Sequence, residues 1–165
     1  MTITARGVRS RLSAPRALLF GALAVGVLDG LDAIVFFGLR SGATPDRIFK
    51  SIAAGLLGPT ARQGGWPMVA LGVGLHFFIA FMIVLVYMVA SRALPVLVRR
   101  PLICGVLYGI VVYAVMNYVV IPRSAVGGAP LSIPPLPVLA NGLLIHMFGV
   151  GLPASLAARA SASHR

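Results

Sequence analysis

Residues 68–90 read MVALGVGLHFFIAFMIVLVYMVA, a run of 23 residues without Asp, Glu, Lys or Arg. An α-helix rises about 1.5 Å per residue, so about 20 apolar residues cross the hydrocarbon core of a bilayer. A run of this length and composition therefore predicts a membrane-spanning helix.

Three further runs have the same character, at residues 17–39, 102–121 and 138–158. The composition agrees, because 59% of the residues are hydrophobic and only 10% are charged, whereas soluble domains carry about 25% charged residues. We therefore expect an all-α fold in which residues 1–165 form a single transmembrane domain. This domain is an integral membrane bundle of four transmembrane helices with the lipid bilayer as its main partner.

The net charge of +11 comes from 14 Lys and Arg against 3 Asp. These basic residues lie at the ends of the apolar runs, where membrane topology and anionic headgroups explain them, so we expect no nucleic-acid partner. Four Arg and the triplet Ala22-Leu23-Ala24 are typical of a signal peptide. The apolar run continues to Leu39, however, which predicts an uncleaved span.

Orientation follows from the distribution of Lys and Arg over the loops. With both termini inside, the cytoplasmic parts carry nine basic residues and the outer loops carry five. The clearest cytoplasmic connection is residues 91–101, with Arg92, Arg99 and Arg100. We therefore expect a multi-pass protein with its N-terminus and C-terminus in the cytoplasm.

The first outer loop contains helix signals. Thr44 precedes Pro45 and Asp46, which is a typical helix start, and Gly58-Pro59 is a typical stop. Apolar residues recur on one face between them, at Ile48, Phe49, Ile52 and Leu56. We expect a short amphipathic helix at about 45–57, either on the membrane surface or as a lid on the bundle. The second outer loop, residues 122–137, holds five Pro and is expected to be stiff and extended.

Ionisable residues inside spans are costly and are the first candidates for function. Counted back from the outer ends of the spans at the helical rise, they and their polar companions lie roughly 5 to 15 Å deep. On each span at least one of them shares a helix face with small residues, which mark close helix packing. The candidate intramembrane polar site is therefore Asp29, Asp32, His76, Tyr113, Asn117 and His146, with Asn141 at a similar depth to Asn117. We expect Asp29 and His76 to face each other.

Three interpretations of this polar layer stay open. The first is a structural network of hydrogen bonds between helices. The second is proton-coupled transport, with a carboxyl and a His exchanging protons. The third is haem or metal binding through His76 and His146, but two histidines are too few to specify such a site, and no cofactor is expected. No catalytic motif occurs, so an enzyme is not expected either.

Several segments resemble a group of small uncharacterised four-span bacterial inner-membrane proteins, to which no activity is assigned. The resemblance rests on Asp29-Gly30-Leu31-Asp32, residues 51–58 (SIAAGLLG), Leu75-His76-Phe77, residues 113–120 (YAVMNYVV) and Pro122. It implies a bacterial inner membrane and the same four-span plan.

The function expected from these features is transport or sensing of a small solute or proton through the polar intramembrane layer. The alternative is a structural or assembly partner within a membrane complex. Four helices leave little room for a pathway, so a homodimer or a complex with another membrane protein is a further expectation.

The topology is testable with reporter fusions. Alkaline phosphatase is active only outside the cytoplasm, so a fusion near Gly128 should be active and a fusion after Ala158 inactive, because the charge distribution holds the C-terminus inside. The reverse pattern would contradict the orientation.

Overall fold

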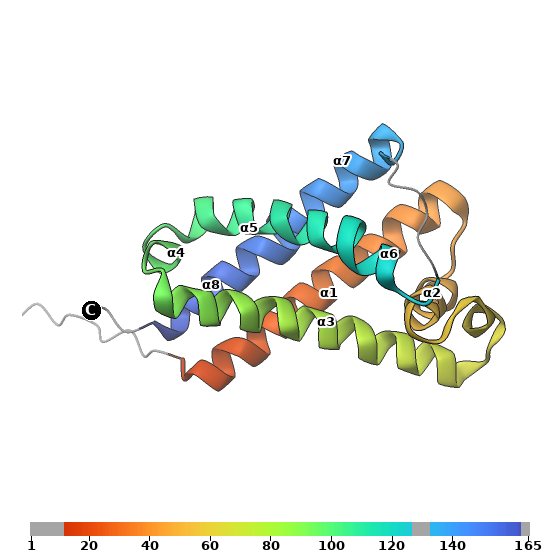
Figure 1. The fold of residues 1–165 in the computed structure, drawn as a ribbon, viewed down its shortest axis with the longest axis horizontal. Helices are drawn as coiled ribbons and strands as arrows, with labels where there is room; N and C mark the ends of the chain where they lie inside the picture. The colour runs from red at the N-terminus through yellow and green to blue at the C-terminus, as the bar shows by residue number, and fades with distance from the viewer. Residues whose placement is uncertain (1–11, 127–132, 163–165) are drawn as a thin grey trace, which may run out of the picture.

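Four long helical segments run along the molecule in the computed structural model, which describes residues 12–126 and 133–162 (Figure 1). The first two are α1 (Ala14–Ser41) and α3 (Trp66–Ala93). The third joins α5 (Pro101–Val115), the π-helical η2 (Met116–Val120) and α6 (Ile121–Arg123). The fourth joins α7 (Leu136–Ile145), the π-helical η3 (His146–Gly151) and α8 (Leu152–Ser161).

Each of the four segments is long and apolar enough to cross a membrane, and the described residues contain no strand. The predicted all-α bundle of four transmembrane helices is therefore confirmed. Each helix extends one to three residues beyond the predicted span at either end. Large apolar side chains such as Phe20, Leu31 and Phe78 are more than half exposed on the outside of the bundle, as expected where lipid is the solvent.

The bundle has two different ends. The terminal end carries the start of α1, the end of α8 and the short α4 (Val96–Arg99) between the second and third spans. The α2 end carries α2 (Pro45–Leu57), the 3-10 turn η1 (Pro59–Gln63) and the start of α7. Gly42 allows the sharp turn from α1 toward α2, because its φ of 66° lies in the left-handed region that side chains disfavour.

The terminal half of the bundle is solid. Its core includes Val84, Tyr87 and Ala154, each at most 1% exposed. Tyr108 on α5 donates a hydrogen bond to the Ile83 carbonyl on α3 at 2.8 Å, and the rings of Tyr87 and Tyr108 meet edge to face with centroids 4.9 Å apart. These contacts hold the second and third spans together near the middle of the bundle.

Glycine brings the third and fourth spans into backbone contact. A Cβ at Gly109 would overlap the carbonyl of His146, and a Cβ at Gly151 would overlap the backbone of Gly105 and Gly109. Such close approach is the usual role of small residues between transmembrane helices. The predicted small-residue faces are therefore packing faces in the structure.

The predicted amphipathic helix is confirmed as α2, with the predicted bounds. It packs on the bundle as a lid rather than floating on a surface, since Ala53 and Ala54 are fully buried. On its other side, the N–H of Ala125 donates to the Gly55 carbonyl at 2.8 Å. The lid alternative is thus the one the structure shows.

The start of α2 differs in detail from the prediction. Thr44 occupies the N-cap position, but its hydroxyl donates to the carboxylate of Asp46 instead of capping a backbone N–H. Lys50 bonds the same carboxylate at 3.0 Å. These hydrogen bonds, first from Thr44 and then from Lys50, hold the pKa of Asp46 below its usual value.

The second outer loop, predicted at residues 122–137, is helical at both of its ends instead of extended. Pro122 lies within α6 and Pro137 within α7, so both helices continue into the predicted loop. Proline is tolerated at the first turn of a helix, which explains Pro137. Residues 127–132 of the predicted loop lie outside the described part of the chain.

The packing of α2 on α3 is testable at two glycines of α3 that are two residues apart and face different sides of the helix. A Cβ at Gly72 would overlap the carbonyl of Phe49, whereas a Cβ at Gly74 meets nothing within 4 Å. Gly72→Ala should therefore destabilise the protein by about 1–3 kcal/mol in reversible unfolding. Gly74→Ala is the matched control and should cause no loss; equal behaviour of the two variants would contradict the packing.

Candidate functional site

A cavity of about 800 Å³ occupies the α2-end half of the bundle. We call it the vestibule. Side chains from all four spans and from α2 line it, and most of them are apolar. All six residues of the candidate polar site line it: Asp29, Asp32, His76, Tyr113, Asn117 and His146. Their convergence on one cavity is an observation; their functional role stays a prediction.

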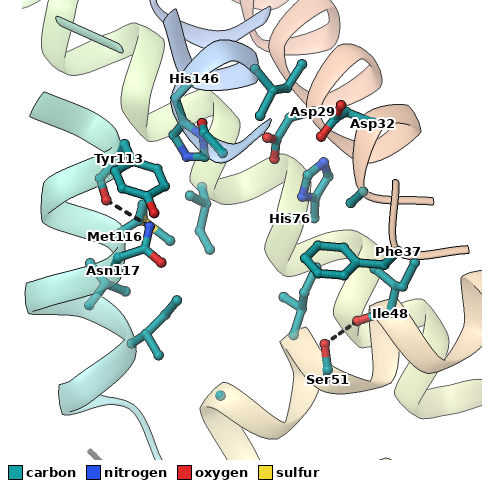
Figure 2. A pocket seen from close by; sticks show the side chains of 18 of the residues that line it. Asp29, Asp32, Phe37, Ile48, Ser51, His76, Tyr113, Met116, Asn117 and His146 are labelled. Carbon is teal, nitrogen blue, oxygen red and sulfur yellow. Dashed lines mark hydrogen bonds between the residues drawn. The ribbon is translucent and has the colours of Figure 1, made fainter. Parts of the chain in front are cut away.

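One wall combines the first two spans. Figure 2 shows Asp29, Asp32 and His76 on this side. The Nε2 atom of His76 lies 2.8 Å from the Gly26 carbonyl, and because a carbonyl only accepts, Nε2 carries a proton. A Cβ at Gly30 would lie 3.2 Å from the same nitrogen. Glycine on α1 thus makes room for the histidine ring, and its Nδ1 is the acceptor in the neutral form.

The opposite wall coincides with the π-helical turns of the third and fourth spans. Asn117 lies in η2 and its Nδ2 donates to the Tyr113 carbonyl four residues earlier at 2.9 Å. His146 opens η3, and its Nδ1 lies 2.8 Å from the Gly142 carbonyl, also four residues earlier. By the same reasoning Nδ1 carries the proton, and neutral His146 keeps Nε2 as its acceptor. Isolated π-helical turns are frequent at functional sites.

The first and fourth spans are joined across the vestibule by one side-chain pair. Asn141 donates through Nδ2 to Oδ2 of Asp32 at 2.7 Å. Asn141 also lines the vestibule, although the sequence prediction gave it only as a companion of the site. Its depth, similar to that of Asn117, was the signal that pointed to it.

The expected pairing of Asp29 with His76 is wrong. Among the described residues the one ion pair is Lys50–Asp46. His76 instead donates its Nε2 proton in a hydrogen bond to a backbone carbonyl of α1. The Asp29 carboxylate forms no ion pair with another described residue and lines the vestibule. It is therefore directed toward whatever fills the cavity.

Sequence reasoning missed the contribution of α2 and η1. Ile48, Ile52 and Leu56 line the vestibule as one apolar row, and Arg47 and Ser51 line it beside them. The sequence analysis did not include these two polar residues in the candidate site. Their spacing of four residues was the available signal, since it places them on one helical row. Exposed Arg62 of η1 adds a second cation at this end.

The arrangement does not suit the metal interpretation. Within residues 12–126 and 133–162, no three His, Cys, Asp or Glu side chains are grouped closely enough to hold one metal ion. His76 and His146 are therefore not joined by a third such ligand in this part of the chain. Axial ligation of haem uses one histidine nitrogen, and a ligating histidine commonly donates its other ring N–H to a carbonyl, so the hydrogen bonds of His76 and His146 do not decide the haem interpretation.

Comparison of the chain with protein-family models, with curated proteins and with solved structures gives no match. The resemblance to small inner-membrane proteins accordingly stays a prediction, and the functional argument rests on the geometry of the vestibule.

The Asp32–Asn141 hydrogen bond is testable by a double-mutant cycle. Polar pairs between transmembrane helices couple by about 0.6 kcal/mol, and at most about 1.7 kcal/mol. Asp32→Ala and Asn141→Ala should show a coupling of this size in unfolding free energy, because each removes the same hydrogen bond.

A matched cycle uses Ser51→Ala with Asn141→Ala. Among the described residues Ser51 bonds only its own helix, through the Ile48 carbonyl at 2.6 Å, so its cycle should be additive. Equal coupling in the two cycles would contradict the assigned pair.

Proposed function

We propose that this chain is a multi-pass protein of the bacterial inner membrane, with both termini in the cytoplasm, that binds a small solute in the vestibule in order to transport or sense it. The observation that carries the proposal is a cavity of about 800 Å³ in which polar side chains from all four spans meet. Small-molecule sites are typically cavities of roughly 300–1,000 Å³ with apolar walls and a few convergent polar groups.

The hydrogen bonds support a binding site over a purely structural network. A structural network would satisfy its members across helices. Of the six candidate residues, only Asp32 and His76 bond another span within the described chain. Asn117 and His146 bond backbone of their own span. Most of the polar capacity is therefore not used for packing, which disfavours the alternative of a structural or assembly partner.

The asymmetry of the bundle supports a one-sided site. Val84, Tyr87 and Ala154 fill the terminal half, while the vestibule reaches exposed residues such as Arg62 at the α2 end. In the proposed topology this arrangement faces outward. A transporter would have to open the terminal half, whereas a sensor would need only to transmit occupancy through α2.

The proposal predicts that water-soluble reagents enter the vestibule. In a Cys104→Ala background, Ala33→Cys should react severalfold faster with a small charged, membrane-impermeant thiol reagent than Val35→Cys, because Ala33 lines the cavity and Val35 does not. Val35 is 57% exposed on the outside of the same helix, where lipid would cover it.

Val35 lies nearer the α2 end of α1 than Ala33 does, so depth alone would favour its labelling. Slower labelling of Ala33→Cys than of Val35→Cys would therefore overturn the proposal of an open binding site.

A further inference from the structure

The polar groups of the vestibule offer mostly hydrogen-bond acceptors. His76 and His146 have each committed their ring proton to a backbone carbonyl, which leaves one acceptor nitrogen on each neutral ring. Asn117 has committed one N–H to the Tyr113 carbonyl, which leaves its Oδ1 as an acceptor and its second N–H as a donor. A solute that satisfies these groups must donate hydrogen bonds.

The charged side chains in the deep part of the vestibule also favour a solute that donates hydrogen bonds, because they are carboxylates. Asp29 and Asp32 are three residues apart on α1 and both line the cavity. Asp32 accepts a hydrogen bond from a neutral amide, and Asp29 has no ion pair within the described residues. Carboxylates within a span are costly unless a cation or water meets them. A cationic solute would compensate this charge.

The cations of the lining are placed elsewhere. Arg47 and Arg62 are exposed and belong to α2 and η1, at the water-facing end. Lys50 is already paired with Asp46 and does not line the vestibule. Water and salt screen exposed charges. The two Arg therefore weaken the attraction between the deep carboxylates and a cationic solute only modestly.

The apolar walls around the carboxylates favour a solute with an apolar body. Phe36, Ile79, Met116 and Ile145 line the same cavity. An inorganic cation would leave these surfaces facing water, whereas an organic solute would cover them. The volume of about 800 Å³ accommodates a molecule with one or two rings.

We propose that the vestibule binds an organic ammonium ion, a protonated primary or secondary amine on an apolar body, with its N–H groups directed to Asp29 and to the acceptor nitrogens of the two histidines. This proposal rests on the proposed function and names the solute class for the same site. No bond is made or broken in binding.

The test uses the full chain in nanodiscs of uncharged phosphatidylcholine and four probes of similar size. These are 2-phenylethylammonium, its N,N,N-trimethyl analogue, 2-phenylethanol and 3-phenylpropionate. Equilibrium dialysis against empty nanodiscs corrects for partition into lipid. We expect the primary ammonium to bind tightest, the trimethyl analogue more weakly because it donates no N–H, and the alcohol and the anion weakest.

Variants locate the binding. Asp29→Asn should weaken the binding of 2-phenylethylammonium by at least about tenfold, because the ammonium group loses its anionic partner. Asp46→Asn is the matched control, since Asp46 lies outside the vestibule, and should leave affinity unchanged. Ala33→Trp should block binding by filling the cavity, whereas Val35→Trp should not.

The outcomes separate the two proposals. If the alcohol or the anion binds as tightly as the ammonium and Ala33→Trp blocks it, the binding site stands and the ammonium proposal is overturned. If no probe binds while Ala33→Cys is reactive, the ammonium proposal is likewise overturned. If probes bind and Ala33→Trp has no effect, the vestibule is not the site and both proposals fall. The comparison of probes on the unaltered chain holds even if Asp29→Asn misfolds.

Discussion

Gly105 and Gly109 on α5 bring its backbone against that of η3 and α8, and the remaining architecture follows from this contact. Lipid provides no hydrophobic driving force between helices, so close backbone packing is one of the few ways to fix two spans against each other. Here it fixes the third and fourth spans. The tyrosines at 87 and 108 then attach the second span near the middle of the bundle, and beyond them the helices enclose a cavity instead of a core.

That cavity resolves the problem posed by ionisable side chains inside spans. Such groups must be paired, hydrogen-bonded or hydrated. In this protein one carboxylate is bonded by Asn141, two histidines bond backbone carbonyls, and Asp29 faces the vestibule. The polar side chains are thus accommodated by a cavity as much as by contacts with one another. Contacts with Gly72 on one side and Ala125 on the other hold α2 across that cavity.

The sequence was sufficient for the large features because they depend on local patterns. Hydropathy located the four spans, and the Pro45 start with the Gly58 stop located α2. The helical rise placed the polar residues at comparable depths, which is why all of them line one cavity. Each of these inferences needs only the chain near the residue concerned.

The partners within the site depend on how helices are rotated, and the sequence does not determine that rotation. Asp29 and Asp32 differ by three positions, about 60° around a helix, and either could have faced the second span. The structure directs His76 to the Gly26 carbonyl and Asp32 to the fourth span. The π-helical turns at 116–120 and 146–151 also escaped prediction, because their sequences continue the apolar pattern of the helices around them.

The central claim is that one half of the bundle is hydrated and the other half is dry. Solid-state NMR of the protein in bilayers, with magnetisation transferred from water to side chains, tests it directly. The account predicts early transfer to Asp29 and His76 and little transfer to Val84 and Tyr87, which are buried in the terminal half. Equal transfer to both pairs, or none to the first, would contradict it.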